Sequence, residues 1–272
     1  MKPDATNALV DLLTLEVLEE NLFRGHSQDL GLPQLFGGQV LGQALSAANL
    51  TVDSSRQAHS LHGYFLRPGD PHRPVIYQVD LVRDGGSFTT RRVSAVQNGR
   101  PIFFCSASFH SKEKSINHQP TMPIVTPPEE LVGTDAVLER FSNHPIEFLY
   151  LGDKANSDLP ARKRIWFRLS GELPDDPALH RYLLAYSSDF HLLTTSLVPH
   201  GLKHPDPRLK VASLDHAIWF HHDVRVDDWL LYDMDSTWAG NARGFSRGSL
   251  YDRNGRLVAS SAQEGLTRLK SH

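Results

Sequence analysis

The chain has 272 residues, 40% of them hydrophobic and 22% charged, which is ordinary for a globular protein of one large or two small domains. The formal net charge of −3 at pH 7 argues against a general nucleic-acid-binding protein, which is normally basic. No apolar run reaches the roughly 20 residues of a membrane span, and the N-terminus lacks a signal-peptide pattern, so we expect a soluble, cytoplasmic protein.

The first half predicts one helix followed by four strands. Gly37-Gly38 precede a segment, residues 39–50, whose apolar residues recur at three- and four-residue spacing with small residues between them. This pattern is typical of a helix that is apolar on most of its circumference and therefore deeply buried. Strands are predicted at residues 59–66, 75–82, 88–97 and 100–110. Asp84-Gly85-Gly86 and Asn98-Gly99 are hairpin-turn signals between the last three strands.

Proline-rich residues 111–161 separate the two halves. Pro120, Pro123, Pro127 and Pro128 each remove a backbone donor, so this stretch is predicted to be a connector. Residues 137–141 are its one candidate helix. Cys105, before the connector, is the single cysteine, and its neighbours Phe103 and Phe104 favour a buried, inert thiol.

The second half repeats the plan of the first. A helix is predicted at residues 183–198 and strands at 211–221, 229–238, 242–252 and 256–266, with Asn254-Gly255 as the last turn. Phe23-Arg24 and Phe167-Arg168 mark an equivalent first strand in each half.

The sequence itself also repeats. RRVSAVQNGRPIFFCSAS from Arg91 matches SRGSLYDRNGRLVASSAQ from Ser246, and SLHGYF from Ser60 matches SLDHAI from Ser213 in the same order. Two collinear matches indicate a duplicated unit. We predict an α+β protein with an N-terminal unit at 1–110, a connector at 111–161 and a C-terminal unit at 162–272.

Five longer motifs run in one order between about Leu12 and Arg268. They are FGGQVLGQAL from Phe36, HSLHGYFLRPGD from His59, RRVSAVQNGRPIF from Arg91, SLDHAIWFH from Ser213 and SSAQEG from Ser260. Together they resemble the acyl-CoA thioesterase II family, the double-hotdog acyl-CoA thioesterases. The resemblance implies two tandem hotdog units, each with a central helix wrapped by an antiparallel sheet. It also implies hydrolysis of fatty acyl-CoA, of medium to long chain, to fatty acid and CoA, without a metal or cofactor.

The resemblance further implies a catalytic trio at Asp189, Ser213 and Gln263. An Asp of this kind accepts a proton from water, while a hydroxyl and an amide direct the water at the thioester carbonyl. Burial is expected to raise the pKa of this Asp. Backbone N–H groups of Gly38 and Gln39, which open the first helix, are candidates to bind the oxyanion.

The repeat adds an argument from asymmetry. It aligns Asp189 with Gln39, Ser213 with Ser60, and Gln263 with Ser108. Only the second copy then carries a carboxylate, which predicts one active site per chain.

Simpler interpretations of the same residues stay open. Without the resemblance, Asp189 is a helix N-cap, and Ser213 and Gln263 are ordinary strand residues. Arg91 and Arg243 are candidates for contacts with the CoA phosphates, but strand arginines more often lie on a solvated face. His62, with Asp215-His216, suggests acid–base work, although a strand histidine is more often a core residue.

Two other functions remain as alternatives. One is a hotdog-fold enoyl-CoA hydratase or dehydratase, which needs an Asp–His pair on one helix segment. Asp189 and His191 would lie about 200° apart around a helix, and this spacing weakens the hydratase alternative. The other is a non-catalytic acyl-CoA-binding protein. In either case we expect a homodimer or higher homo-oligomer, because double-hotdog sheet faces commonly pair.

Overall fold

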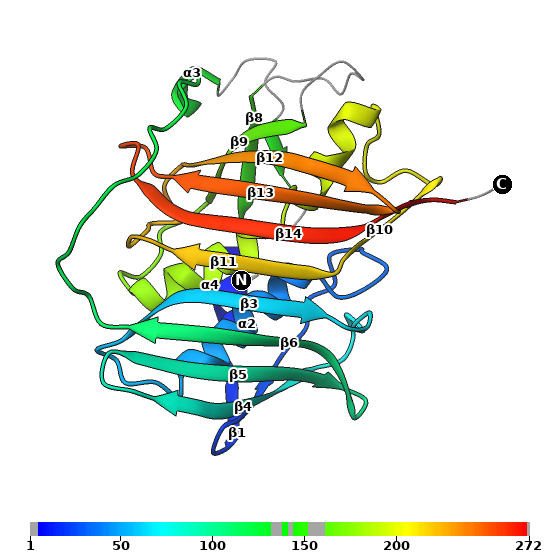
Figure 1. Cartoon of the computed structure of the whole chain (residues 1–272). Helices are drawn as coiled ribbons and strands as arrows, with labels where there is room; N and C mark the ends of the chain where they lie inside the picture. The colour runs from blue at the N-terminus through cyan, green and yellow to red at the C-terminus, as the bar shows by residue number, and fades with distance from the viewer. Residues whose placement is uncertain (1–4, 132–137, 141–143, 152–160, 271–272) are drawn as a thin grey trace. The chain divides into compact units, whose positions relative to one another are not determined.

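The computed structural model describes residues 5–131, 138–140, 144–151 and 161–270 (Figure 1). By its internal contacts the chain forms two compact units. The first unit contains residues 1–117, 174–189 and 217–220, and the second contains residues 118–173, 190–216 and 221–272. The boundaries predicted from the sequence, at residues 110 and 161, divide the chain into its two duplicated copies rather than into these compact units. They stay predictions. Within the described residues, no helix is long and apolar enough to cross a membrane.

The first unit is an antiparallel sheet with helices on one face, and α2 lies behind strands β3–β6 in Figure 1. Its strands pair in the order β1-β2-β4-β5-β6-β3. The elements are α1 (Ala5–Leu13), β1 (Glu16–Glu19), β2 (Leu22–Gly25), α2 (Gly37–Asn49), β3 (Gln57–Phe65), β4 (Val75–Asp84), β5 (Phe88–Gln97), β6 (Arg100–His110) and α4 (Pro177–Ser188), with residues 217–220 of β11 (Asp215–Phe220).

Helix α2 is the core of the first unit, as its apolar circumference predicted. It packs on β3, β4, β5 and β6 on one side and on α4 on the other. A Cβ atom at Gly38 would lie only 2.2 Å from the carbonyl oxygen of Tyr186, and one at Gly42 3.0 Å from that of Tyr182. Glycine at these positions therefore lets the two helices approach closely, and the pairing shows that they run antiparallel.

The second unit is also an antiparallel sheet with a helix against it. Its strands pair in the order β14-β13-β12-β9-β8-β7, and β10 also pairs with β14. The 3₁₀-helix η1 packs on β9, β12, β13 and β14. The elements are α3 (Pro128–Leu131), β7 (Leu138–Arg140), β8 (Ile146–Tyr150), β9 (Arg162–Leu169), η1 (Leu193–His200), β10 (Leu209–Ser213), β12 (Leu230–Gly240), β13 (Arg243–Tyr251) and β14 (Leu257–Leu269). Each unit thus has the helix-against-sheet plan of a hotdog, as expected.

The helix predicted at 183–198 is wrong as one continuous element. α4 ends at Ser188, Asp189 is its C-cap, and η1 begins only at Leu193. His191 between them has a φ of 65°, in the left-handed region that ends a right-handed helix. The N-cap interpretation of Asp189 is therefore wrong as well.

Two further predictions need correction. The strand predicted at 211–221 is two strands, because Leu214 lies between β10 and β11 and donates its N–H to Glu264 O at 2.9 Å. Part of the predicted connector is regular structure: β8 is a strand in the sheet of the second unit, and residues 138–140 of the candidate helix form strand β7. Residues 137 and 141 lie outside the described residues.

The two repeated turns differ in conformation. Asn98 and Gly99 have φ of 51° and 68°, so both central residues are left-handed, as predicted for a tight hairpin. In the second copy Gly255 alone of the pair has a positive φ, of 79°. The Asp252 carboxylate there accepts the N–H groups of Asn254 and Arg256, which closes a longer loop.

This difference changes the register of the strands that follow. Counted outward from each turn, the buried cross-strand pairs Val93·Cys105 and Arg91·Ala107 correspond to Gly248·Ser261 and Ser246·Gln263. The structural counterpart of Gln263 is thus Ala107. The alignment of Gln263 with Ser108 is wrong, because Ser108 belongs to the other face of its strand, and a one-residue slip exchanges the faces.

Candidate active site

Asp189 lies beside the N-terminus of α2, within the first unit. A Cβ atom at Gly37, the first residue of α2, would be 2.7 Å from Asp189 Oδ2 and 3.0 Å from Phe65 Cζ. Gly37 therefore leaves the space that the carboxylate occupies. Phe36, the N-cap residue of α2, makes no side-chain capping bond. The first-turn N–H groups of a helix attract anions through their partial positive charge, so this end of α2 suits a negative group.

Aromatic side chains surround this carboxylate. Phe36 and Tyr186 meet edge to face with ring centroids 5.1 Å apart, and Phe65 packs against Phe103. Burial, and then the negative charge of Asp189, raises the pKa of Tyr186 above its ordinary value. Sequence reasoning missed Phe65 and Tyr186 as neighbours of Asp189, since nothing local in the sequence marks these long-range contacts.

Ser213 and Gln263 meet in the second unit. The Gln263 amide is fully buried and donates from Nε2 to Ser213 Oγ at 2.9 Å. The two residues come from neighbouring strands, since Ser213 on β10 pairs with Gly265 on β14. A serine hydroxyl that accepts this bond keeps its own proton to donate. The pair can therefore present a fixed hydroxyl donor.

Within the predicted trio, the structure shows one contact, between Gln263 and Ser213. Asp189 belongs to the first unit with α2, and Ser213 and Gln263 belong to the second. Their convergence on one water stays a prediction.

Gly38 and Gln39 are placed at the first turn of α2, as expected for oxyanion donors. Gly38 is a glycine because of helix packing, since its closest neighbours are Tyr186 O and the Phe36 ring. The Gln39 side chain is buried, accepts from the backbone N–H of Gln28 and donates to His26 O. Only the backbone N–H groups of Gly38 and Gln39 are left as candidates for an oxyanion.

Arg91 is a structural residue, which corrects its assignment as a CoA contact. Its side chain is 3% exposed. The guanidinium donates to the hydroxyl and carbonyl of Thr51 and to the carboxylate of Asp84, among other acceptors. A group committed in this way cannot reach a phosphate in solvent. Arg243 differs: it is exposed, pairs with Glu264 at 3.4 Å and lies over the Trp238 ring, so it stays a candidate.

The histidine alternatives lack support from their surroundings. His62 is an exposed residue in edge-to-face contact with Trp219, not the core residue that its strand suggested. Burial lowers the pKa of His216 to about 3, which makes it a poor base partner for Asp215. Asp215 instead accepts the Glu264 N–H at 2.6 Å. Cys105 is fully buried, and burial raises the pKa of its thiol to about 12, as expected for an inert cysteine.

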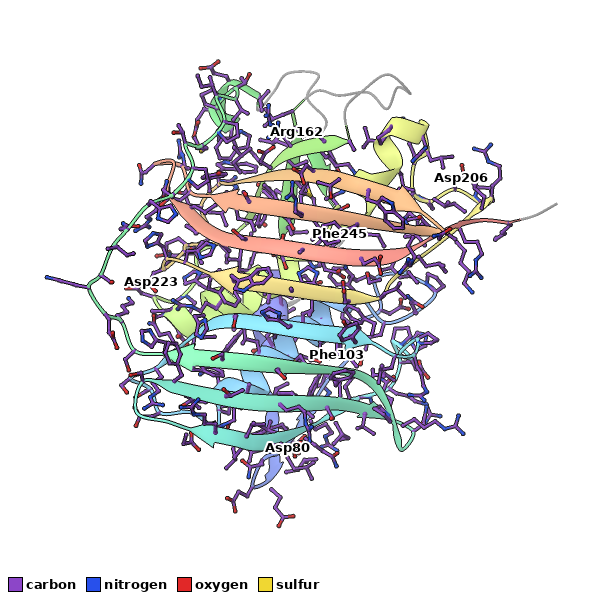
Figure 2. The ribbon with its side chains drawn as sticks, viewed as in Figure 1. Asp80, Phe103, Arg162, Asp206, Asp223 and Phe245 are labelled. Carbon is purple, nitrogen blue, oxygen red and sulfur yellow. The ribbon has the colours of Figure 1, made fainter. Side chains whose placement is uncertain are left out.

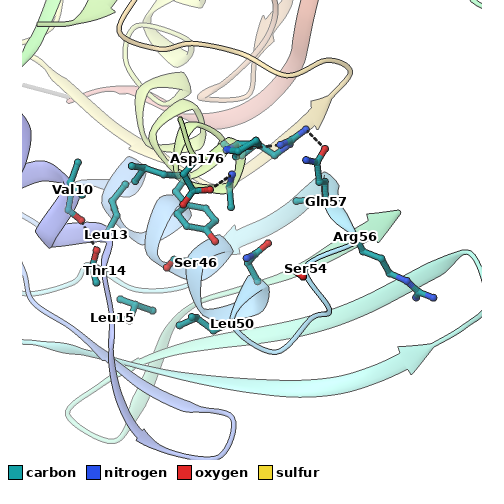
Figure 3. A pocket seen from close by; sticks show the side chains of 17 residues that line it. Val10, Leu13, Thr14, Leu15, Ser46, Leu50, Ser54, Arg56, Gln57 and Asp176 are labelled. Atoms are coloured by element: carbon teal, nitrogen blue, oxygen red, sulfur yellow. Dashed lines mark hydrogen bonds between the residues drawn. The ribbon is translucent and has the colours of Figure 1, made fainter. Parts of the chain in front are cut away.

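An open cavity of about 520 Å³ lies at the other end of α2 (Figure 3). Its walls include Leu13 of α1, Leu50 after α2, and Arg181 of α4, whose guanidinium donates to Gln57 at 2.9 Å. Because α2 has 13 residues, its length of about 20 Å separates this cavity from Gly37. The cavity is therefore distinct from the surroundings of Asp189.

Comparisons with known proteins agree on one family. A family model described as Acyl-CoA thioesterase matches residues 140–266, and one described as Acyl-CoA thioesterase N-terminal domain matches residues 27–110. The chain is 40% identical to Acyl-CoA thioesterase 2 of Haemophilus influenzae, over 97% of this chain and 98% of that protein.

Solved structures support the same conclusion. The crystal structure of the acyl-CoA thioesterase II TesB2 from Mycobacterium marinum is 43% identical, covers 96% of this chain and 98% of its own, and superposes with a TM-score of 0.84. A hot dog fold protein of Alicyclobacillus acidocaldarius, 18% identical over 97% of this chain and 99% of its own, has a TM-score of 0.81 and confirms the fold. The chain therefore belongs to the acyl-CoA thioesterase II family and is a hydrolase of acyl-CoA thioesters.

Proposed function

We propose that Asp189, Ser213 and Gln263 hold the water that hydrolyses a medium- to long-chain acyl-CoA. The observation that carries the proposal is the position of the Asp189 carboxylate beside the first residue of α2, Gly37, and next to Phe65. A base there would stand beside the N–H groups that can bind the oxyanion. The bond from buried Gln263 to Ser213 gives second support, because it fixes a hydroxyl in one direction.

The reaction needs only these groups. Asp189 takes a proton from water as the water oxygen attacks the thioester carbon, and the carbonyl oxygen becomes an oxyanion bound by the N–H groups of Gly38 and Gln39. Collapse of this intermediate breaks the C–S bond and expels the CoA thiolate. A thiol pKa of about 8.5 lets it leave without a strong acid. The proton on Asp189 then passes to the thiolate or to solvent, and fatty acid and CoA are the products.

The register of the two copies supports a single site per chain. Position for position, the first unit has Ala107 where the second has Gln263. It also has Arg91, whose guanidinium is hydrogen-bonded within the fold, where the second has Ser246. The first copy would therefore lack the amide as well as the carboxylate.

The aromatic residues near Asp189 support the proposed preference for a medium to long acyl chain. Phe36 and Phe65, which are both partly exposed, offer apolar surface near the carboxylate. Each buried CH₂ group of an acyl chain contributes about 0.8 kcal/mol to binding in such surroundings. We expect kcat/KM to rise from butyryl-CoA to decanoyl-CoA, and the absence of any rise would contradict this preference.

The direct test is thiol release from decanoyl-CoA by the wild-type chain and by Asp189→Asn. Removing the base should lower kcat by about 10²- to 10⁴-fold with a much smaller change in KM. Asp11→Asn, an exposed carboxylate on α1, is the matched control and should keep the wild-type rate. An Asp189→Asn chain with wild-type kcat would overturn the assignment of the base. Hydration of crotonyl-CoA without thiol release would favour the hydratase instead.

The expected absence of a metal or cofactor and the cytoplasmic location are tested separately. Water and the three side chains suffice for the steps above, so dialysis against a chelator should leave thiol release unchanged. Fractionation of the source cells, followed by immunoblotting, tests the location.

A further inference from the structure

The ring of Phe65, the last residue of β3, lies at the start of α2 near the Asp189 carboxylate. A Cβ atom at Gly37 would be 3.0 Å from Phe65 Cζ and 2.7 Å from Asp189 Oδ2. Both distances start from one point, so the ring and the carboxylate are themselves neighbours. Gly37 has no side chain to separate them. The first unit therefore places an apolar ring next to the side chain to which we assign the role of base.

The ring meets this space with its edge. Its atoms nearest to the Cβ position of Gly37 are Cζ and Cε1, at 3.0 and 3.1 Å. The edge of an aromatic ring carries partial positive charge, and its face carries partial negative charge. An anion is therefore attracted to this edge although the ring is apolar. A carboxylate that turned away from Phe65 toward solvent would lose this attraction.

Phe65 is itself held in place from β6. It is the cross-strand partner of Phe103, and the two ring centroids are 5.0 Å apart. Phe103, labelled in Figure 2, is fully buried, whereas Phe65 is partly exposed. The backbone that follows is fixed as well, because Ile102 O accepts the N–H groups of Leu66 and Arg67 at 2.8 and 3.2 Å. The ring therefore has a fixed position at the border of the core.

A second ring near the carboxylate comes from a different element. The negative charge of Asp189 contributes to the raised pKa of Tyr186, which is fully buried and contacts Phe36 edge to face. Tyr186 belongs to α4, the helix that Asp189 caps, and moves with it. Phe65 belongs to the sheet. It therefore gives the carboxylate a reference that does not depend on its own helix.

The sequence repeat gives the second copy no such ring. SLHGYF from Ser60 aligns with SLDHAI from Ser213, which sets Phe65 against Ile218. Ile218 is aliphatic and fully buried, so it offers an anion no aromatic edge. The ring is thus found in the copy whose strand ends beside the carboxylate. This is expected of a residue that serves the carboxylate rather than the fold that both copies share.

We propose that Phe65 is a positioning residue for the hydrolysis, whose ring holds the Asp189 carboxylate beside Gly37 in the orientation from which it takes the proton of water. The proposal rests on the proposed role of Asp189 as the base. An aspartate side chain rotates about two bonds, and this one is partly exposed, so solvent competes for its carboxylate. A misplacement of about 1 Å costs about 10²-fold in rate, which is why one orientation must be held.

The test is thiol release by Phe65→Ala from butyryl-CoA and from decanoyl-CoA. We expect kcat to fall about 10- to 100-fold for both substrates, with little change in the KM of butyryl-CoA. The losses should be equal because the ring acts on the base, which both substrates share. Phe88→Ala is the matched control. It removes a 45% exposed ring of β5 whose cross-strand partner is His110, the last residue of β6, and should keep the wild-type rate.

A double variant shows whether Phe65 acts through Asp189. If it does, adding Phe65→Ala to Asp189→Asn causes no further loss of kcat. Losses that add would overturn the positioning role. The single variants separate this proposal from that of the base. An Asp189→Asn chain with wild-type kcat overturns both, whereas a slow Asp189→Asn chain together with a folded Phe65→Ala chain of wild-type kcat overturns only the positioning role.

A contact with the acyl chain is the competing role for this ring. A loss confined to decanoyl-CoA, or a rise in KM alone, would assign Phe65 to that role and decide against the proposal. If Phe65→Ala loses its native circular dichroism spectrum, Phe65→Leu replaces it. Leucine keeps most of the volume but has no aromatic edge, so a smaller loss of kcat is expected, again equal for both substrates. A folded Phe65→Leu chain with wild-type kcat would contradict the proposal.

Discussion

At the scale of single residues, the bond between Gln263 and Ser213 connects the stability of the fold to the proposed catalytic role of Ser213. A fully buried amide that loses its acceptor keeps its desolvation cost, about 1–3 kcal/mol. Ser213→Ala should therefore lower the free energy of unfolding by that amount and reduce kcat for decanoyl-CoA by more than tenfold. Ser213→Thr keeps the hydroxyl and should restore most of both. Urea unfolding and thiol release measure the two effects, and a Ser213→Ala chain with wild-type kcat would remove Ser213 from the mechanism.

Ser246, which lies opposite Gln263 on β13, is expected to affect stability in the opposite direction to Ser213. Its side chain is fully buried, and within the described part of the chain its Oγ has no hydrogen-bond partner. An unpaired buried hydroxyl destabilises the folded state. Ser246→Ala is expected to raise the free energy of unfolding by about 1 kcal/mol. A clear loss of stability in urea unfolding would show that the hydroxyl does have a partner in solution.

At the scale of elements, the N-terminus of α2 connects helix packing to the candidate base. Gly37→Ala would put a methyl group 2.7 Å from Asp189 Oδ2. Alanine favours a helix over glycine by up to about 1 kcal/mol, so global stability should change little while the carboxylate is pushed aside. We expect kcat for decanoyl-CoA to fall at least tenfold with the melting temperature nearly unchanged.

The matched control for this helix position is Gly86→Ala. A Cβ atom at Gly86 would meet nothing within 4 Å, so the rate should stay at the wild-type value. Equal rates for both alanine variants would mean that the position of Asp189 does not depend on Gly37.

The elements also show where sequence patterns suffice and where they do not. Strands β5 and β6 begin and end at the predicted residues, because an alternating pattern is closed by an Asn-Gly turn that both φ values confirm. Helix α2 is recovered for a similar reason, since its periodicity is uninterrupted. Phe23-Arg24 and Phe167-Arg168 do lie on equivalent strands, β2 and β9, which pair with β4 and β12.

The predictions that were wrong depend on tertiary structure, which local sequence patterns do not show. The apolar spacing of 183–198 continues through the break at Asp189 to Leu192, so periodicity alone cannot find it. The repeat alignment fails at Gln263 because the second turn has a different geometry, and one residue of register moves a side chain to the other face. For the candidate site, the family motifs predicted Asp189, Ser213 and Gln263, a prediction that stays open, whereas the neighbours Phe65 and Tyr186 could be found only from the folded structure. Arg91 was misassigned because a strand pattern does not reveal its bonds to Thr51 and Asp84.

At the scale of the whole molecule, buried histidines set the response of stability to acid. Burial lowers the pKa of His216 to about 3 and that of His144 to about 4. In the unfolded chain a histidine has a pKa of about 6.5, so below this pH the unfolded state binds protons that the folded state does not. The buried histidines therefore cost the fold nothing above pH 6.5. As the pH falls below 6.5, each of them lowers the free energy of unfolding, by about 2 kcal/mol at pH 5.

The measurement is the free energy of unfolding in urea at pH 7.5 and at pH 5. His216→Gln removes one such group, so the difference between the two pH values should shrink by about 2 kcal/mol relative to the wild-type chain. The comparison is between slopes, so a loss of packing that lowers stability equally at both pH values does not affect it. His72→Gln, at a histidine whose side chain is 72% exposed, is the matched control and should leave the slope unchanged. An unchanged slope in His216→Gln would mean that His216 gains a proton in the folded chain near its ordinary pKa. Solvent would then have to reach the His216 side chain.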